Sequence, residues 1–376
     1  MDGRGYRVKA RLSDGSNPAA GDTGVAPIAT GQSPTSPSVG SALRLPEIDP
    51  LSGVRLPTMA DVTRAREVLA GYLRPTPLLS TPALDELLGF QAFLKCENLQ
   101  PIGAFKVRGG LFLMSELPDA DRGRGVVTAS TGNHGQSIAY AAREFDVPAT
   151  IWMPEVANAL KVASMRRLGA DVRFAGRDFD ETRAVAEEDA AARDAYYVVA
   201  ANDWRLIAGV ATYTLEMLEQ EPDLDVLIVP AGGGSGLSGA CLAGKSISPR
   251  LRIVGTQAAG APVIFNTWRS GQLAEIAAAD TFAEGLATRV AFSLPAQILW
   301  PLLDDFRLVS DADMRRGILT LLERARVLAE GAGAAALAAA YAMREELAGQ
   351  KVGIVVSGGN LTLDTLTETL AMEQAW

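Results

Sequence analysis

The chain has 376 residues, 48% of them hydrophobic, and a formal net charge of −9 at pH 7. This length allows a large core and about two domains, and an acidic chain without a basic cluster is not expected to bind nucleic acid or anionic membranes, which leaves small molecules as partners. The longest apolar stretches, such as 332–341, are far shorter than the roughly 20 residues of a membrane-spanning helix.

Cysteine and histidine are both scarce. Cys96 and Cys241 lie among apolar residues, a pattern typical of buried free thiols, and this fits a reducing cytoplasm, where we expect the protein to be found. His134 is the single histidine, which excludes a histidine-rich metal site and a Ser-His-Asp triad.

The first 50 residues are rich in Gly, Ser, Pro, Ala and Thr and have no hydrophobic period, so we predict a disordered tail over residues 1–50. The tail has no continuous apolar segment typical of a secretory signal. It is either dispensable or, as an alternative, regulatory. Apolar residues then recur at helical spacing over 58–73, and the prolines of 74–77 end that helix.

The rest of the chain alternates between short apolar strands and amphipathic helices, a pattern that predicts βαβ units with parallel strands. We therefore predict an α/β fold with two lobes, because the strands fall into two runs. The predicted strands are 125–129, 149–153, 170–174 and 196–199 in the first run, and 226–229, 251–256 and 351–356 in the second. The predicted helices of the first run are 133–145, 158–168 and 179–193.

Lys106 is the strongest candidate for a catalytic residue. The apolar run 91–96 predicts a strand, the Pro and Gly of 98–103 predict a turn, and a helix beginning near Ala104 places Lys106 in its first turn. The positive end of the helix dipole disfavours an ammonium, so the pKa of Lys106 should fall and its amine should become nucleophilic. The alternative is a solvated surface lysine.

Three further segments lie between a predicted strand and a turn or helix. Residues 130–136 (STGNHGQ) predict a helix start that binds an anion such as a carboxylate, although an ordinary helix cap is the alternative. The glycine-rich segment 230–239 predicts a phosphate-binding turn, and a tight corner is the alternative. Its spacing departs from the G-x-G-x-x-G of dinucleotide-binding proteins. Ser357-Gly358-Gly359-Asn360 follows the last predicted strand, where ligands of open α/β sheets collect, unless it is a plain turn.

The segment 95–110 (KCENLQPIGAFKVRGG), together with these three segments, resembles the fold-type-II pyridoxal-phosphate enzymes, and among them the threonine/serine dehydratase group. The resemblance covers roughly residue 58 to the end. It implies a two-lobed, tryptophan synthase β-like fold with parallel-rich twisted sheets flanked by helices. In that fold residues 123–200 form a small domain inserted into a large cofactor-binding domain made of residues 51–122 and 201–376. The chain departs from the family pattern at Ala104 and at Ser235, where a serine and a fourth glycine are common.

The resemblance also implies roles for individual residues. Lys106 would be the catalytic residue, joined to pyridoxal 5′-phosphate as a Schiff base, and Ser357 would contact the pyridine nitrogen. The implied cofactor-binding residues are Lys106, Phe105, Asn133, Gly232, Gly233, Gly234, Ser235, Gly236, Glu330 and Ser357. The implied substrate-binding residues are Ser130, Thr131, Gly132, Asn133, His134 and Gly285. His134 could be an acid or a base, although a structural hydrogen bond is the simpler role.

We expect no metal ion. Some members of the resembling family bind a divalent cation through a glutamate, and that position here is Gln257, whose neutral amide is a poor replacement for a carboxylate. We expect a homodimer or homotetramer.

The expected reaction is elimination and deamination of a β-hydroxy amino acid, foremost L-threonine or L-serine, to a 2-oxo acid and ammonia. A larger or acidic β-hydroxy amino acid is an alternative substrate. A serine or 3-hydroxyaspartate racemase is a second alternative, although Thr131 stands where racemising relatives carry serine. A non-catalytic regulatory subunit with the same fold is a third.

Overall fold

The computed structural model describes residues 45–376 except 158 and 178. The predicted tail therefore lies outside the described residues, apart from 45–50. In that short part Asp49 is fully buried, and Ile48 forms an antiparallel bridge with Arg55. The helix predicted after it is α1 (Met59–Leu69), whose N-terminus Thr58 caps by accepting from the backbone N–H of Asp61.

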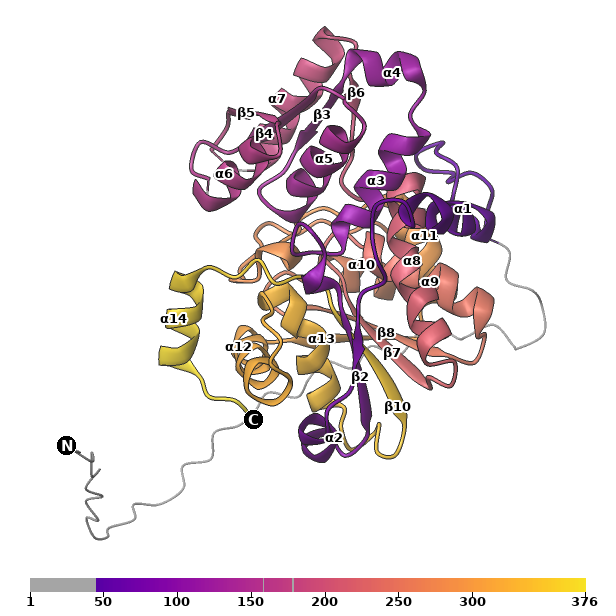
Figure 1. Ribbon diagram of the computed structural model, residues 1–376, viewed down its shortest axis with the longest axis vertical. Helices are drawn as coiled ribbons and strands as arrows, with labels where there is room; N and C mark the ends of the chain where they lie inside the picture. Colours follow the sequence, from indigo (N-terminus) through magenta and orange to yellow (C-terminus); the bar gives the residue numbers. More distant parts are fainter. Residues whose placement is uncertain (1–44, 158, 178) are drawn as a thin grey trace, which may run out of the picture.

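Two sheets organise the chain (Figure 1). The strand pairs of the smaller sheet are all parallel, and the larger sheet has one antiparallel pair at its edge. The larger sheet has the order β1-β2-β10-β7-β8-β9, and only the β1–β2 pair is antiparallel. Its strands are β1 (Leu78–Leu79), β2 (Gln91–Cys96), β10 (Lys351–Val356), β7 (Val226–Pro230), β8 (Arg252–Ala258) and β9 (Asp305–Val309). The smaller sheet has the order β5-β4-β3-β6, with β5 (Asp171–Phe174), β4 (Ala149–Met153), β3 (Val126–Ala129) and β6 (Tyr196–Tyr197). The predicted fold class is confirmed.

Helices cover both faces of the larger sheet, because alternate residues of a strand point to opposite faces. Ile354 of β10 packs in one apolar cluster with α13 (Gly331–Ala342), whereas Val355 packs in another with α8 (Trp204–Gln220) and α9 (Ser235–Ile247). The other helices that lie outside the smaller sheet's segment are α2 (Pro82–Leu88), α3 (Lys106–Glu116), α10 (Val263–Ser270), α11 (Ser293–Leu302), α12 (Asp311–Thr320) and α14 (Leu363–Met372).

The smaller sheet is built from one continuous part of the chain and lies at the top of Figure 1. Its helices are α5 (Asn133–Glu144), α6 (Ala159–Arg167) and α7 (Phe179–Ala192), and α4 (Asp119–Arg124) precedes it. On this basis we propose the domain division stated above, with 123–200 as the inserted domain.

The prediction omitted two strands of the larger sheet. β9 alternates charged and apolar residues at a sheet edge, where Asp305 pairs with Arg252 and Arg307, so it lacks the continuous apolar run of a buried strand. β1 has only two residues.

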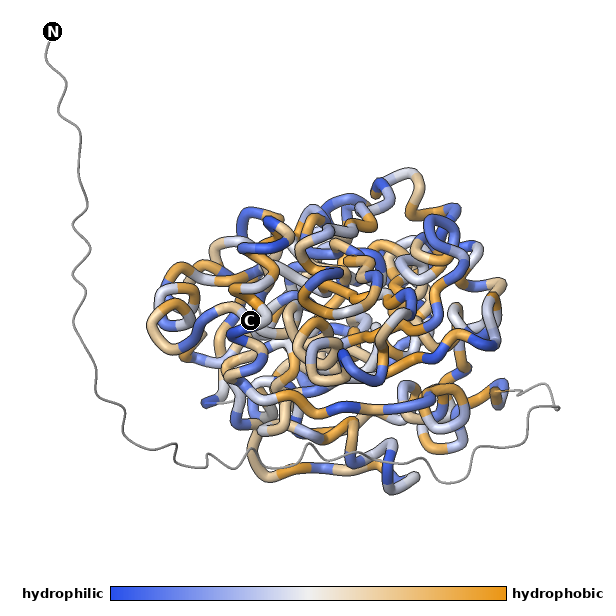
Figure 2. The backbone as a smooth tube through the Cα atoms, turned by 90° about the horizontal axis from the view of Figure 1, so that it is seen from below, coloured by the Kyte–Doolittle hydropathy of each residue, from blue (hydrophilic) through white to orange (hydrophobic). Residues whose placement is uncertain are grey.

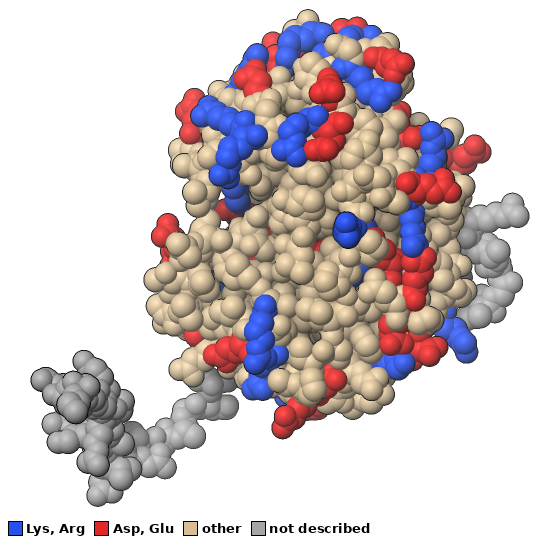
Figure 3. Space-filling view, viewed as in Figure 1, with Lys and Arg blue, Asp and Glu red and all other residues tan. Residues whose placement is uncertain are grey.

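Hydrophobic and hydrophilic residues intermix along the whole described chain (Figure 2). Within residues 45–376 as described, no helix is long and apolar enough to cross a membrane. On the face drawn in Figure 3, acidic and basic side chains are interspersed, as expected for a chain without a basic cluster.

Candidate active site

Lys106 is the first residue of α3, and the preceding turn is attached to the end of β10. Ala104 forms a bridge with Gly358, and the backbone N–H of Phe105 donates to the carbonyl oxygen of Ser357 at 3.0 Å. β2 and β10 are parallel neighbours, so their carboxyl ends lie side by side. This pairing brings the lysine turn and the Ser357 turn together.

The amine of Lys106 reaches the glycine-rich turn. Its Nζ donates to the hydroxyl of Ser235 at 2.9 Å and lies 5.2 Å from the centre of the Phe105 ring. Burial lowers the pKa of Lys106 to about 8. The direction is the predicted one, and the cause is loss of hydration, which the prediction from the helix dipole had not invoked.

The glycine-rich turn joins β7 to α9, and its glycine positions have no room for side chains. A Cβ built at Gly232 would lie 2.0 Å from the carbonyl oxygen of Gly285, and one at Gly233 would lie 3.0 Å from the Cβ of Ala201. Gly234 has φ +94°, a left-handed conformation that favours glycine. A Cβ at Gly236 would contact the Phe105 ring at 3.0 Å. The turn thus places bare backbone at the start of α9, which suits a phosphate.

The loop before α5 has the features of an anion site. The hydroxyl of Ser130 accepts from the backbone N–H groups of Gly132 and Gly135, at 3.2 and 2.8 Å, so Ser130 shapes the loop. Among the described residues, the backbone N–H groups of Thr131, Asn133 and His134 have no acceptor. Three unpaired donors at a helix start fit the predicted carboxylate.

Asn133 is the centre of a hydrogen-bond chain that joins three distant segments. Its Nδ2 donates to Oε1 of Glu330 at 2.7 Å, and its Oδ1 accepts from Nδ2 of Asn360, also at 2.7 Å. Asn360 donates in addition to the carbonyl oxygen of Ile102 at 2.9 Å. Burial raises the pKa of Glu330. The prediction had quoted Asn360 in its motif but had given it no role.

Ser357 presents a hydroxyl that no protein group occupies. The residue is 6% exposed, and no hydrogen bond joins its Oγ to another described residue. Its Oγ is not among the fully enclosed polar atoms that lack a partner, so it faces open space. This group therefore fits the predicted partner of a ring nitrogen.

His134 is held in a structural hydrogen bond. Thr128 donates its hydroxyl hydrogen to the carbonyl oxygen of Val198 at 2.9 Å, so Nε2 of His134, 3.0 Å away, must be the donor to that hydroxyl. Burial, and next the charge of Lys106, lower the pKa of His134 to about 3. The imidazole is neutral at ordinary pH and its Nε2–H faces Thr128.

Two charged residues to which the prediction gave no role flank the loop. Lys161 of α6 forms an ion pair with Glu284, the residue before Gly285. Nζ of Lys161 also lies over the loop, 3.7 Å from a Cβ built at Gly132. No motif contains Lys161, and it becomes recognisable only when α6 is placed over the loop.

Gln257 has a hydrogen-bonding role of its own. Its Oε1 accepts from the backbone N–H groups of Ile264 and Phe265 at 3.0 and 3.2 Å, at the start of α10. Within the described residues no group of three or more His, Cys, Asp or Glu side chains could hold a metal ion.

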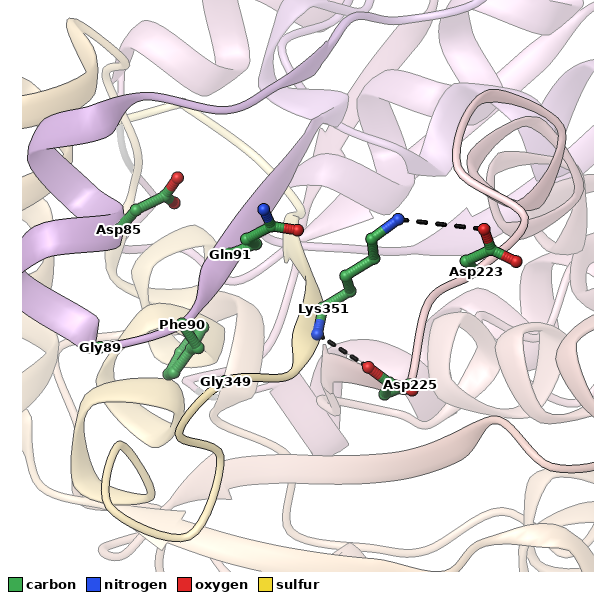
Figure 4. Close-up of a pocket in the computed structure, with 8 residues that line it drawn as sticks. All are labelled: Asp85, Gly89, Phe90, Gln91, Asp223, Asp225, Gly349 and Lys351. Atoms are coloured by element: carbon green, nitrogen blue, oxygen red, sulfur yellow. Dashed lines mark hydrogen bonds and ion pairs between the residues drawn. The ribbon is translucent and has the colours of Figure 1, made fainter.

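A surface pocket of about 630 Å³ lies elsewhere (Figure 4). It is lined at the amino ends of β2 and β10 by Gln91 and Lys351, and Lys351 there contacts Asp223 and Asp225. The six residues of β10 separate this pocket from Ser357 by about 20 Å. It is therefore separate from the candidate active site.

The residues at the carboxyl ends of the strands fit pyridoxal 5′-phosphate: a half-buried amine, a glycine-rich turn for the phosphate and an unpaired hydroxyl for the ring nitrogen. Comparison with known families gives the same cofactor. The model of the pyridoxal-phosphate dependent enzymes matches residues 69–358, and the chain belongs to this family.

Individual relatives cover most of the chain. An L-threonine ammonia-lyase of Thermotoga maritima is 37% identical over 309 residues, which are 82% of this chain and 77% of that protein. An L-threo-3-hydroxyaspartate ammonia-lyase of Saccharomyces cerevisiae is 37% identical over 308 residues, 82% of this chain and 94% of that protein. The structure of maize serine racemase is 32% identical with a TM-score of 0.79, and the match covers 84% of this chain and 98% of that one.

Proposed function

We propose that the protein removes water and ammonia from a β-hydroxy amino acid, foremost L-threonine or L-serine, and releases a 2-oxo acid. The observation that carries the proposal is the 2.9 Å hydrogen bond from Lys106 Nζ to Ser235 Oγ, which joins the amine to the phosphate-binding turn. The names of the ammonia-lyase relatives support the reaction class. We also propose a cytoplasmic homodimer or homotetramer.

The bound cofactor supplies an electron sink conjugated to Cα of the substrate. The unpaired N–H groups at the start of α5 would bind the α-carboxylate, and the Ser357 hydroxyl would pair with the ring nitrogen. A hydroxyl cannot keep that nitrogen protonated as a carboxylate would, so the sink is weak and favours loss of a β-leaving group.

Lys106 is the base in this proposal. Lys106 would hold the cofactor aldehyde, and its amine, when free, would accept the α-proton, because a pKa of about 8 leaves it largely neutral at mildly alkaline pH. The α-proton and the β-hydroxyl leave as water. The remaining enamine hydrolyses to the 2-oxo acid and ammonia. His134 is not a proton source here, because its Nε2–H is bonded to Thr128.

Racemisation is the second candidate, and the similarity to maize serine racemase favours it. It needs a proton donor on the face opposite Lys106. Thr131 is exposed in the loop before α5, and its methyl group crowds that face more than a serine would. We therefore propose elimination as the main reaction. A non-catalytic role is disfavoured, because partial burial of the Lys106 amine lowers the stability of the fold and a protein without cofactor chemistry would gain nothing from it.

The test is incubation of the purified protein with L-threonine, L-serine and 3-hydroxyaspartate, with assays for 2-oxo acids and for the D-enantiomers. We expect 2-oxo acid from at least L-threonine and an absorbance band from the cofactor Schiff base. Reduction with borohydride should remove this band and leave a pyridoxyl group attached to Lys106. Lys106→Ala is the matched control and should show neither. A protein that carries the band but produces only D-amino acids would overturn the elimination assignment.

A further inference from the structure

Four charged side chains are buried together behind α3. Lys95 of β2 and Glu97 at the start of the following turn are fully buried, and Arg108 of α3 and Glu216 of α8 are 1% and 8% exposed. We call these four residues the buried ion cluster. Arg108 follows Lys106 by two residues in the helix, so the cluster lies on the side of α3 that faces away from the amine.

Arg108 uses every hydrogen-bond donor of its guanidinium. Nε and Nη2 donate to the two oxygens of Glu97 at 2.8 Å each. Nη1 and Nη2 donate to the two oxygens of Glu216 at 2.7 and 2.8 Å, and Nη1 also donates to Thr212 at 3.1 Å. Five donors with five acceptors fix the position of the side chain, and through it the first turn of α3.

The remaining groups complete the charge balance. Nζ of Lys95 donates to Glu216 at 2.6 Å and to the carbonyl oxygen of Thr76 at 2.9 Å, and the Thr76 hydroxyl donates to Glu97 at 2.6 Å. Two cations and two carboxylates give a formal charge of zero. A buried charge without a partner is strongly disfavoured, so this balance is a requirement of the site.

Backbone packing holds the cluster and the amine in one rigid body. A Cβ built at Gly209 of α8 would lie 2.6 Å from the carbonyl oxygen of Arg108, and one at Gly109 would lie 2.9 Å from that of Leu206. Because α3 and α8 touch through their backbones, a shift of Glu216 is passed to the turn that carries Lys106.

We propose that the buried ion cluster is a charge-balanced clamp, with Arg108 as its positioning residue, which sets the place of Lys106 and leaves its amine in surroundings of no net charge. The other titratable groups near Lys106 are His134 of α5, Tyr213 of α8, which packs edge-on against Phe105, and Glu330 before α13. Burial is the cause of the lowered pKa of Lys106, and the cluster contributes no opposing charge. The inference rests on Lys106 being the cofactor amine.

The test separates charge from position by four variants of the full chain. Lys95→Met leaves a net negative cluster and Glu97→Gln a net positive one, and Arg108 keeps both of its contacts to Glu216 in each. The measurement is the rate at which cofactor-free protein takes up pyridoxal 5′-phosphate, followed by the absorbance band from pH 6 to 10. Only the neutral amine attacks the aldehyde, so the midpoint of this profile reports the pKa of Lys106.

We expect the midpoint to rise by about 0.5–1 pH unit in Lys95→Met and to fall by about the same amount in Glu97→Gln. The double variant Lys95→Met/Glu97→Gln restores a net charge of zero and should return the midpoint to that of the unchanged protein. Arg108→Lys keeps the charge but loses the two-pronged contacts, so the midpoint should stay while kcat falls about 10- to 100-fold with little change in KM.

The control is Arg64→Met, which removes an ion pair to Glu116 at the other end of α3, where Arg64 is largely exposed. It should change neither the midpoint nor kcat. Midpoints that do not move, or that move in the same direction in both single variants, would overturn the inference and leave the cluster a purely structural feature. Absence of the absorbance band in the unchanged protein would instead refute the cofactor assignment of Lys106.

Discussion

Asn133 and Glu330 lie 197 residues apart in the chain, and the amide of Asn133 donates to the Glu330 carboxylate at 2.7 Å. The contact joins the start of α5, beside the smaller sheet, to the start of α13 on the larger one. It brings the predicted substrate loop and the predicted pocket wall into direct contact. Only Glu330 of the two can change its charge with pH, which makes the contact testable.

Glu330→Gln should remove a pH-dependent cost. Burial raises the pKa of Glu330 in the folded state. Below the ordinary carboxyl pKa the group is protonated in both the folded and the unfolded state, and as pH rises above that value the unfolded state loses its proton first, so stability falls. Glutamine has no charge to bury, so the unfolding temperature of the variant should fall less between pH 4 and 8 than that of the unchanged protein. Asn133→Ala should keep the decline while lowering kcat/KM about 10- to 100-fold, because it loses the contacts to both Glu330 and Asn360. An identical pH profile for Glu330→Gln and the unchanged protein would contradict the expectation.

Lys106→Met should abolish activity and stabilise the cofactor-free protein. The folded-state pKa of Lys106, about 8, is below its ordinary value of 10.5, so near pH 7 the fold bears the cost of a buried ammonium. We expect a gain of about 1–3 kcal/mol in the free energy of unfolding, which disappears above pH 10.5, where the amine is neutral in both states. Denaturant unfolding at pH 7 and pH 11 checks this, and a loss of stability at pH 7 would contradict it.

Gly232→Ala should weaken cofactor binding by at least about tenfold. The new Cβ would collide with the backbone oxygen of Gly285, so the turn or its neighbour must move. Equilibrium dialysis of the cofactor measures the effect. Gly123→Ala is the matched control, since a Cβ there meets no atom within 4 Å and α4 should gain up to about 1 kcal/mol.

His134→Gln should flatten the acid side of the stability profile. The pKa of His134 is lowered to about 3 in the folded protein. Between pH 6.5 and 3 the imidazole is therefore protonated in the unfolded state but neutral in the folded state, so the stability of the unchanged protein falls as pH decreases through this range. The glutamine amide can still donate to Thr128. The variant should keep most of its activity from pH 6 to 9, and a 100-fold loss would instead give His134 a chemical role.

Chelation should leave the protein unchanged. The amide oxygen of Gln257 is engaged by two backbone N–H groups of α10, so no cation is needed to hold that helix start. Activity and thermal unfolding should be the same with EDTA and with added Mg²⁺ or Mn²⁺. A rise in the unfolding temperature with either cation would contradict the expected absence of a metal.

Local patterns allowed much of this molecule to be predicted. Apolar runs such as 351–356 correspond to strands, and the turn after β7 has its glycines where a side chain would meet Gly285 or Phe105. What the sequence could not show is which distant groups meet. The contacts from Asn133 to Glu330 and Asn360 and the pairing of Arg108 with Glu216 depend on packing between elements, and the burial that lowers the pKa of Lys106 has the same origin.

The pairing of β2 with β10 has a consequence for synthesis of the protein. β10 is the last strand of the described chain, yet it borders β2, and Gly358 just after it forms the bridge to the turn before Lys106. During synthesis the lysine therefore precedes the strand that holds its turn by more than 240 residues. A chain cut before residue 351 lacks the neighbour of β2, so the ribosome must complete β10 before the lysine turn gains its support.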